Sequence, residues 1–202
     1  MKSVLISIQP KWCELIASGQ KTIEVRKTKP KLETPFKVYI YCTQGDALAM
    51  PCLNTPKYTI HRMHNGTLKG RRMTAEEREK SDHLFANGKV IGEFVCNEIT
   101  VAECGSYCNI PINESQLSAW DLLDYANEKT VYGWHISDLV IYDKPKELSE
   151  FNFPHYRDCD IDCKKCKFGF PVEVTGGVEY DCDRRIKRPP QSWCYVESIE
   201  SE

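Results

Sequence analysis

The sequence contains no long hydrophobic run. Its apolar N-terminal stretch is interrupted by Ser7, Gln9 and Lys11, so it is too short for the core of a signal peptide and far too short to span a bilayer. We therefore expect a protein that stays inside the cell, in the cytoplasm, without a membrane partner.

The sequence also has no excess of charge of one sign. It has 27 Lys and Arg residues against 29 Asp and Glu residues, a formal net charge of -2, so the chain as a whole does not attract polyanions. Any nucleic-acid site must be a local patch. Internal repeats and low-complexity tracts are missing too. A length of 202 residues fits one domain, with or without an insertion, better than two.

Cysteine, in contrast, is plentiful. The chain has 11 cysteines, and without an export signal they are expected to stay reduced, so metal ligation or simple burial is favoured over a disulfide framework. The odd number indicates the same. Six of them are expected to be packing or surface residues, namely Cys13, Cys42, Cys52, Cys96, Cys104 and Cys108.

The N-terminal residues predict a strand, a helix and a second strand. Residues 4–8 form an apolar run of strand length, and Pro10 can then begin a helix over residues 11–18, which Gly19 ends. On the strand predicted over residues 22–26, Glu24 and Arg26 share the face opposite the apolar side chains, because side chains alternate along a strand.

The rest of the chain predicts a long strand at 90–101 and further short strands at 38–42, 133–136, 139–142 and 193–197. Thr74 with Glu77 is a capping box for a helix over 74–87, and Asn113 with Gln116 is a second capping pattern, for a helix that reaches Asn127. That helix would carry an apolar stripe of Leu117, Trp120 and Leu123. This pattern predicts an α+β fold, a small and mostly antiparallel β-barrel with flanking helices.

Residues 19–26 read GQKTIEVR and resemble the G-x-K-x-x-E-x-R motif of the ASCH family, within the PUA-like superfamily, at every specified position. The segments LISIQPKWCELIASG, VYIYCT, KVIGEFVCNEI and RPPQSWCYVE are similar to other strands and helices of that family. The resemblance covers residues 1–42, 89–151 and 188–197. It implies a single PUA-like domain over residues 1–202, with insertions at about 43–88 and 154–187. It also implies a cleft beside the motif, expected to be basic, that binds a nucleic acid, RNA in the first place, or a nucleotide.

The motif residues suit such a cleft. Lys21 follows the turn at Gly19 and is expected at the cleft rim as a compact positive charge, while Glu24 and Arg26 can contact each other and a base or phosphate. Lys27 and Gln191 are expected as supporting contacts. The alternative is a solvated surface ion pair that contributes little.

Basic residues gather in three stretches. Residues 1–31 contain seven Lys or Arg against two Glu, and residues 57–72 contain five basic residues and no acid, together with Tyr58, His61 and His64. Rings among cations suit an unpaired nucleic-acid strand, although a solvated loop would have the same composition. The third stretch consists of Arg184, Arg185, Lys187 and Arg188.

The segment before this third stretch is rich in cysteine. The spacing C-x3-C-x2-C, followed by a fourth cysteine after fifteen residues, predicts a structural zinc site formed by Cys159, Cys163, Cys166 and Cys182. His155 or Cys194 could replace one ligand. The alternative is a set of ordinary reduced cysteines in a loop.

Two hydrolytic functions stay open beside binding. ASCH-like amidohydrolases use a Lys and a Thr three residues later; here Lys21 matches, but position 24 is Glu and Thr22 points to the opposite strand face. A metal-independent ribonuclease could use Glu24 as base and Lys21 as cation, near Tyr41 or Ser7. The sequence favours a binding module over hydrolysis, and an adaptor that binds proteins through the cysteine-rich insertion is a third class.

Overall fold

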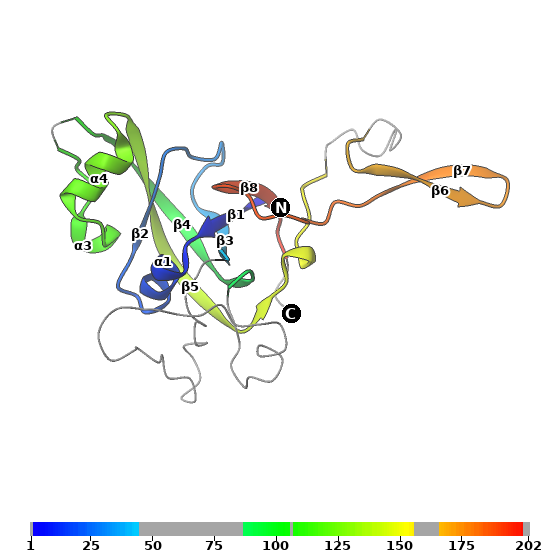
Figure 1. Cartoon of the computed structure of the whole chain (residues 1–202), viewed down its shortest axis with the longest axis horizontal. Coiled ribbons are helices and arrows are strands. Elements are labelled where there is room, and N and C mark those ends of the chain that lie inside the picture. Colours follow the sequence, from blue (N-terminus) through cyan, green and yellow to red (C-terminus); the bar gives the residue numbers. More distant parts are fainter. Residues whose placement is uncertain (1, 45–86, 106, 156–165, 200–202) are drawn as a thin grey trace.

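The computed structural model describes residues 2–44, 87–105, 107–155 and 166–199 (Figure 1). Its helices are α1 (Pro10–Ala17), α3 (Ile112–Ser115), α4 (Ala119–Ala126) and the short η1 (Leu148–Glu150). Its strands are β1 (Lys2–Ile8), β2 (Ile23–Arg26), β3 (Phe36–Cys42), β4 (Val90–Glu103), β5 (Thr130–Lys146), β6 (Gly169–Val174), β7 (Gly177–Cys182) and β8 (Trp193–Glu197). None of the helices in these ranges is long and apolar enough to cross a membrane.

Six strands form one sheet in the order β2-β5-β4-β3-β1-β8. Only the β1–β3 pair is parallel; the other four pairings are antiparallel, so the predicted α+β class with a mostly antiparallel sheet is confirmed. Within the described ranges no pairing joins the edge strands β2 and β8. The predicted closure into a barrel is therefore not confirmed.

The sheet carries a core on both faces. One cluster packs Val4, Ile6, Phe94 and Trp134 against α1 residues, and the other packs Leu5, Tyr39 and Phe151. Because successive residues of β1 enter opposite clusters, this strand is buried on both faces, as its nearly unbroken apolar sequence requires. The strand is thus a fixed base for the residues that follow it.

The predicted strand, helix and strand at the N-terminus are confirmed. Pro10 stands at the first turn of α1, where its missing N–H costs nothing, and Gly19 has a φ of +73°, the left-handed conformation that favours glycine after a helix. Ile23 and Val25 of β2 are buried on the inner face. This short turn places Lys21 directly before β2.

The single helix predicted up to Asn127 is wrong. Gln116 takes a left-handed conformation, with a φ of 57°, and ends α3, after which Ser118 and Asp121 form the capping box of α4. Trp120, expected in the apolar stripe, is 82% exposed, and Leu122 and Ala126 form the buried side instead. The helix predicted over 74–87 lies outside the described residues.

The strands predicted at 133–136 and 139–142 form one strand, β5. The polar pair Ser137 and Asp138 between them does not end the strand, because Asp138 adopts a positive φ of 46° and the ladder with β4 shifts register around it. The strand continues to Lys146, and η1 follows it.

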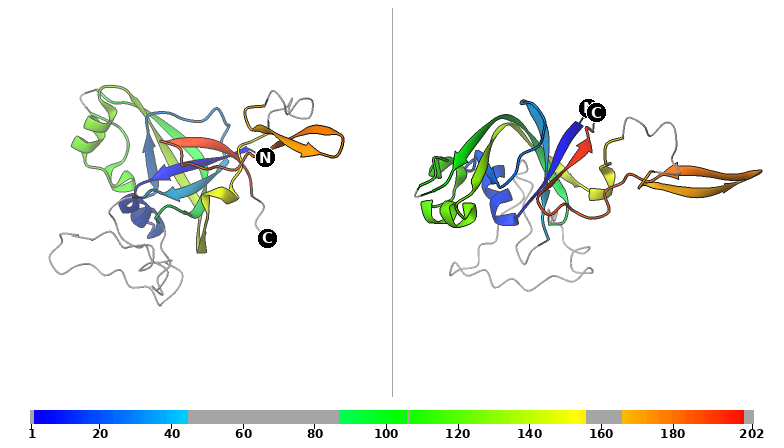
Figure 2. Two further views of the ribbon diagram at one scale, coloured as in Figure 1. Left: turned by 45° about the vertical axis from the view of Figure 1, so that its right-hand side comes forward. Right: turned by 90° about the horizontal axis from the view of Figure 1, so that it is seen from above.

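Strands β6 and β7 form a two-stranded hairpin that extends away from the main sheet (Figures 1 and 2). It lies in the segment 154–187, where the sequence departs from the resemblance. The chain from β7 runs back to the main sheet and enters it as β8, which pairs with β1 (Figure 2). The segment between β7 and β8 thus connects the hairpin with the sheet.

Candidate nucleotide-binding cleft

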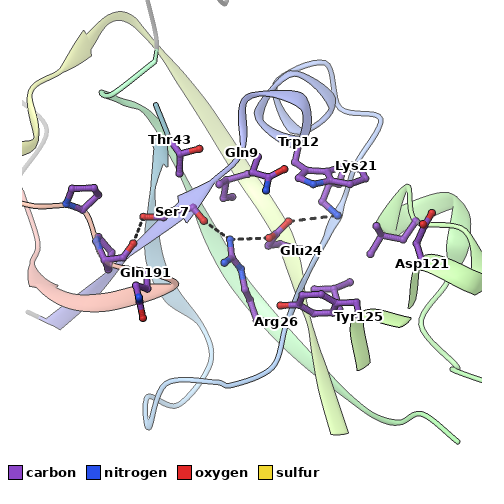
Figure 3. Close-up of a pocket in the computed structure, with 15 residues that line it drawn as sticks. Ser7, Gln9, Trp12, Lys21, Glu24, Arg26, Thr43, Asp121, Tyr125 and Gln191 are labelled. Carbon is purple, nitrogen blue, oxygen red and sulfur yellow. Dashed lines mark hydrogen bonds and ion pairs between the residues drawn. The ribbon is translucent and has the colours of Figure 1, made fainter. Parts of the chain in front are cut away.

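A cleft of about 660 Å³ opens beside the motif residues. Its lining comes from the end of β1, α1, β2 and α4, and from the segment 189–191 before β8 (Figure 3). Lys21, Glu24, Arg26 and Gln191, four of the five predicted ligand-binding residues, line it. The fifth, Lys27, lies beside the cleft, with its Nζ 4.9 Å from the centre of the Tyr125 ring, which does line the cleft.

Lys21 lies deeper than expected. Its side chain is 2% exposed, and its Nζ donates a 2.5 Å hydrogen bond to the carbonyl oxygen of Ser115, the last residue of α3. The same Nζ lies 3.5 Å from Oε2 of Glu24. The expectation that Lys21 stands at the cleft rim is therefore wrong, because α3 covers its ammonium group and turns it towards Glu24.

Arg26 joins separate segments at the cleft. Its Nη2 lies 2.9 Å from Oε1 of Glu24 and donates a 2.6 Å hydrogen bond to the carbonyl oxygen of Ser7, at the end of β1. Its Nη1 is 3.4 Å from the hydroxyl of Ser192, next to β8. The expected contact between Glu24 and Arg26 is thus present. The two side chains are 8% and 11% exposed, so they do not form a solvated surface pair.

The cleft is also lined by two aromatic rings that the sequence analysis did not single out. One is Trp12 of α1. The Nζ atoms of Lys21 and Lys11 lie 5.1 Å and 4.4 Å from the centre of its ring. Tyr125 comes from α4, and in the view of Figure 3 the two rings lie on opposite sides of the ion pairs. Both residues reach the cleft through packing of separate helices, and neither stands in the motif.

The charges that line the cleft are balanced. Lys21 and Arg26 face Glu24, and Asp121 adds a second carboxylate from α4. The carboxylate of Asp121 accepts hydrogen bonds from Ser118, which hold its pKa below the usual value. The cleft is therefore less basic than expected, and offers fixed donors and acceptors rather than a strong positive field.

Burial changes the protonation behaviour of two groups here. Desolvation lowers the pKa of the Lys21 ammonium below 10.5, and the nearby Glu24 carboxylate opposes this shift. Burial also raises the pKa of the Tyr125 phenol. The phenol therefore stays neutral, and the ammonium loses its proton more easily than a surface lysine.

The residues considered for hydrolysis are placed differently. Ser7 lines the cleft, and its hydroxyl donates a 2.6 Å hydrogen bond to the carbonyl oxygen of Pro190. Tyr41 pairs with Ser7 in the sheet but does not line the cleft, because its side chain packs in the apolar cluster with Leu5 and Tyr39. Thr22 is exposed, unlike Lys21, as the alternation of side chains predicted.

Two of the four predicted zinc ligands are described. Cys166 and Cys182 lie at the same end of the hairpin, because Cys182 pairs with Gly169, whose N–H donates to the carbonyl oxygen of Cys166. Cys159 and Cys163 lie outside the described residues. Within the described ranges no group of three or more His, Cys, Asp or Glu side chains could hold a metal, so the zinc site stays a prediction.

Cys104 and Cys108 differ from the expectation of reduced thiols. They are joined as a disulfide across the loop after β4, with their Cα atoms 4.5 Å apart. The close spacing of four residues brings them together where the chain turns towards α3. Cys13, Cys42 and Cys96 are buried, as expected of packing residues.

The cleft combines hydrogen-bond donors, an acceptor and aromatic rings. Lys21 and Arg26 donate hydrogen bonds, the carboxylate of Glu24 accepts them, and a base edge carries both kinds of group side by side. The rings of Trp12 and Tyr125 provide flat apolar surfaces on which a base can stack.

Three solved structures of an ASCH protein from Zymomonas mobilis are similar to the chain: two single-residue variants and the parent protein. The first variant is 16% identical, with a TM-score of 0.46, and the match covers 98% of this chain and 91% of that one. The second variant is 15% identical, with a TM-score of 0.49, and the match covers 96% of this chain and 88% of that one. The parent has 16% identity, a TM-score of 0.43, and coverage of 96% and 87%.

No curated protein matches the chain. The family model described as the ASCH domain matches residues 6–140, more than half of the 202 residues. That range includes Lys21, Glu24 and Arg26. It covers β2, β3 and β4 fully and β1 and β5 in part, and β8 follows it. The chain therefore belongs to the ASCH domain family.

Proposed function

We propose that this protein binds a nucleic acid, RNA in the first place, or a nucleotide, in the cleft beside Lys21, Glu24 and Arg26. The observation that carries the proposal is the meeting of these three charged side chains with Trp12 and Tyr125 in one cleft. The ASCH domain is a PUA-like family commonly thought to bind RNA.

The hydrogen-bond inventory of the cleft supports a ligand there. Arg26 lines the cleft, yet its buried Nε has no hydrogen-bond partner among the described residues. A buried donor without an acceptor costs free energy, about 1–3 kcal/mol. Because this Nε has almost no accessible surface, the guanidinium would have to shift before an acceptor of a ligand, such as a carbonyl oxygen of a base, could satisfy it.

We also propose that the sheet curves towards the PUA-like barrel that the sequence predicts. Side chains bridge its two edges: Arg26 of β2 reaches Ser192 beside β8, and Nε1 of Trp193 in β8 donates a 3.0 Å hydrogen bond to the hydroxyl of Thr28, just after β2. The N–H of Lys31 donates to the hydroxyl of Tyr195 at 2.7 Å. These contacts bring the edges close without a strand ladder between them.

Hydrolysis of RNA or of a modified nucleoside is a second candidate function, favoured by one observation. The lowered pKa of Lys21 beside the Glu24 carboxylate resembles the environment in which lysine takes part in proton transfer. Glu24 occupies the position of the amidohydrolase threonine, and the Ser7 hydroxyl already donates to Pro190. The cleft therefore lacks an activated hydroxyl among its motif residues, and binding without turnover is the better supported function.

The test is a retention assay with labelled pools of single- and double-stranded RNA and DNA, scored for retention and breakdown together. Wild-type protein is compared with the double variant Lys21→Ala, Glu24→Ala, after circular dichroism has shown that the variant is folded. We expect intact RNA to be retained by the wild type and lost by the variant. Breakdown that the variant abolishes would establish hydrolysis instead. No retention of any pool, together with no binding of single nucleotides in calorimetry, would contradict the proposal.

We further propose the zinc site of the cysteine-rich segment as a structural element. Its support is the position of Cys166 and Cys182 at one end of the β6–β7 hairpin, which packs little apolar surface of its own. A metal bound there would hold the two ends of this hairpin together.

A further inference from the structure

A second hollow, of about 640 Å³, lies where the β6–β7 hairpin meets the rest of the chain. Four basic side chains and one acid line it: Lys167, Arg185, Lys187, Arg188 and Asp183. Unlike the cleft, whose charges are balanced, this hollow has a clear positive surplus. The positive surplus suits phosphate groups, which the cleft does not attract strongly.

The acid in the hollow positions two of the cations. The carboxylate of Asp183 accepts from Nε of Arg185 at 2.8 Å and lies 3.0 Å from Nζ of Lys187. Both cations are largely exposed, at 62% and 73% of their side chains. Asp183 therefore holds both cations in place while their remaining donors face solvent. These donors can form hydrogen bonds with the oxygens of a phosphate group.

Aromatic rings accompany these cations. Phe153 and Phe168 stack with their ring centres 5.2 Å apart and at 16° to each other, and Phe170, 41% exposed, also lines the hollow. Nζ of Lys167 lies 4.7 Å from the centre of the Phe168 ring. Exposed rings among cations are the combination that binds unpaired bases together with their backbone.

One short segment joins the hollow to the cleft. Lys187 and Arg188 line the hollow, and the next three residues, Pro189, Pro190 and Gln191, line the cleft. Because a chain rises at most about 3.6 Å per residue, the Cα atoms of Arg188 and Gln191 are no more than about 11 Å apart. The two prolines also restrict the backbone of this segment, so both sites lie along one fixed path.

The hairpin beyond the hollow has the opposite charge. Its exposed acidic residues are Glu173, Glu179 and Asp181. These carboxylates repel a phosphate backbone, so a bound strand would not follow the hairpin outwards. The basic surface is confined to the base of the hairpin, next to the cleft.

We propose that the natural ligand is a single-stranded nucleic acid longer than one nucleotide, with one base in the cleft and the adjoining backbone phosphates in the basic hollow. The inference rests on the proposed function and selects a strand over a free nucleotide. All residues that line the hollow follow residue 140, where the family match ends. Segment 187–191 is the bridge between the two.

The test measures affinity as a function of strand length and salt. Fluorescence anisotropy compares mixed-sequence RNA and DNA strands of up to about twelve nucleotides, and calorimetry measures single nucleotides. The variant Lys187→Ala, Arg188→Ala is compared with the wild type and with a matched control, Lys129→Ala, Lys144→Ala, which removes two exposed cations elsewhere. All three proteins are first shown to have the same melting temperature.

We expect the wild-type affinity to rise with strand length. In the Lys187→Ala, Arg188→Ala variant the affinity for long strands should fall about tenfold, and the slope of log K against log salt should shrink by about 1.4, the value for two lost phosphate contacts on a single strand. Single-nucleotide affinity and the control variant should match the wild type.

Three results would overturn the inference while the proposed function stands, and the first two come from the strand titrations. One is equal affinity and salt slope of the wild type and the Lys187→Ala, Arg188→Ala variant on long strands, and the other is an affinity that does not depend on length. A preference for duplexes would also overturn it. Failure of the wild type to bind both nucleotides and strands would instead overturn the proposed function itself.

Discussion

The carboxylate of Glu24 and the guanidinium of Arg26 form an ion pair, 2.9 Å between Oε1 and Nη2, on the outward face of β2. Glu24 also faces the Lys21 ammonium through its other oxygen, at 3.5 Å. A single buried carboxylate thus compensates two buried cations. The three motif residues depend on each other, and Glu24 is the one whose loss leaves the largest unbalanced charge.

This dependence predicts an order of stability. Glu24→Gln should lower the free energy of unfolding by about 3 kcal/mol, because it leaves Lys21 and Arg26 buried without a counter-charge. Lys21→Met should lower the free energy of unfolding by less, about 1 kcal/mol. Glu24 keeps its ion pair with Arg26 in this variant, and the methionine side chain fills the space of the lysine chain. Urea unfolding of both variants measures this. The account is contradicted if Lys21→Met is the more destabilising change.

The lowered pKa of Lys21 predicts how stability changes with pH. The folded chain releases this proton at a lower pH than the unfolded chain does, so between the lowered pKa and 10.5 the unfolded state binds more protons. The contribution of Lys21 to stability therefore rises with pH in that window, just below 10.5. Below the window its protonated form carries the full desolvation cost.

Unfolding free energies of the wild type and Lys21→Met, measured from neutral pH to 10.5, isolate this effect, since the tyrosines and cysteines titrate in both proteins. We expect the wild type to gain stability relative to the variant as pH rises. A constant or shrinking difference would show that burial does not shift this ammonium as described.

The two rings predict a stacking contribution to affinity. Trp12→Leu and Tyr125→Leu should each weaken RNA binding by about 1–3 kcal/mol, the contribution of one stacked base. Trp120→Leu is the matched control, because Trp120 is 82% exposed and lies on the same helix as Tyr125 but outside the cleft lining. Anisotropy titrations measure all three; equal losses in Trp120→Leu and Tyr125→Leu would speak against a cleft-specific contact.

The zinc proposal predicts one zinc ion per chain in protein purified without chelator, measured by elemental analysis. Cys182→Ser should lose it, because Cys182 lies beside Cys166 at the end of the hairpin. Cys194→Ser should keep it, because Cys194 lies in β8 and packs in the cluster of Leu5 and Tyr39, where burial raises the pKa of its thiol to about 11. A zinc content far below one per chain would remove the proposal.

The sequence was informative where local rules decide the structure. Pro10 and Gly19 bound α1, and the alternation of β2 predicted that Glu24 and Arg26 share a face and that Ile23 and Val25 point inward. These features depend on neighbours within a few residues. The five expected ligand-binding residues came instead from the resemblance to the ASCH motif, and four of them line one cleft.

The remaining features depend on contacts between distant segments. Nothing near Lys21 in the sequence indicates that Ser115 of α3 would accept its hydrogen bond, so its burial could not be predicted. Trp12 and Tyr125 reach the cleft from two helices that meet only in the folded chain. The helix that reaches Ala126 is capped by the box of Ser118 and Asp121, five residues after the expected capping residue Asn113.

The most direct test of the cleft is photocrosslinking of RNA that contains 4-thiouridine, followed by mass spectrometry of the modified peptides. Because the proposed ligand places a base between the two rings, we expect crosslinks on the peptides that contain Trp12 and Tyr125, and their loss in the Glu24→Gln variant but not in a Glu173→Gln control on the hairpin. Crosslinks confined to other surfaces, with these two peptides unmodified, would contradict the central claim that this cleft holds a nucleobase.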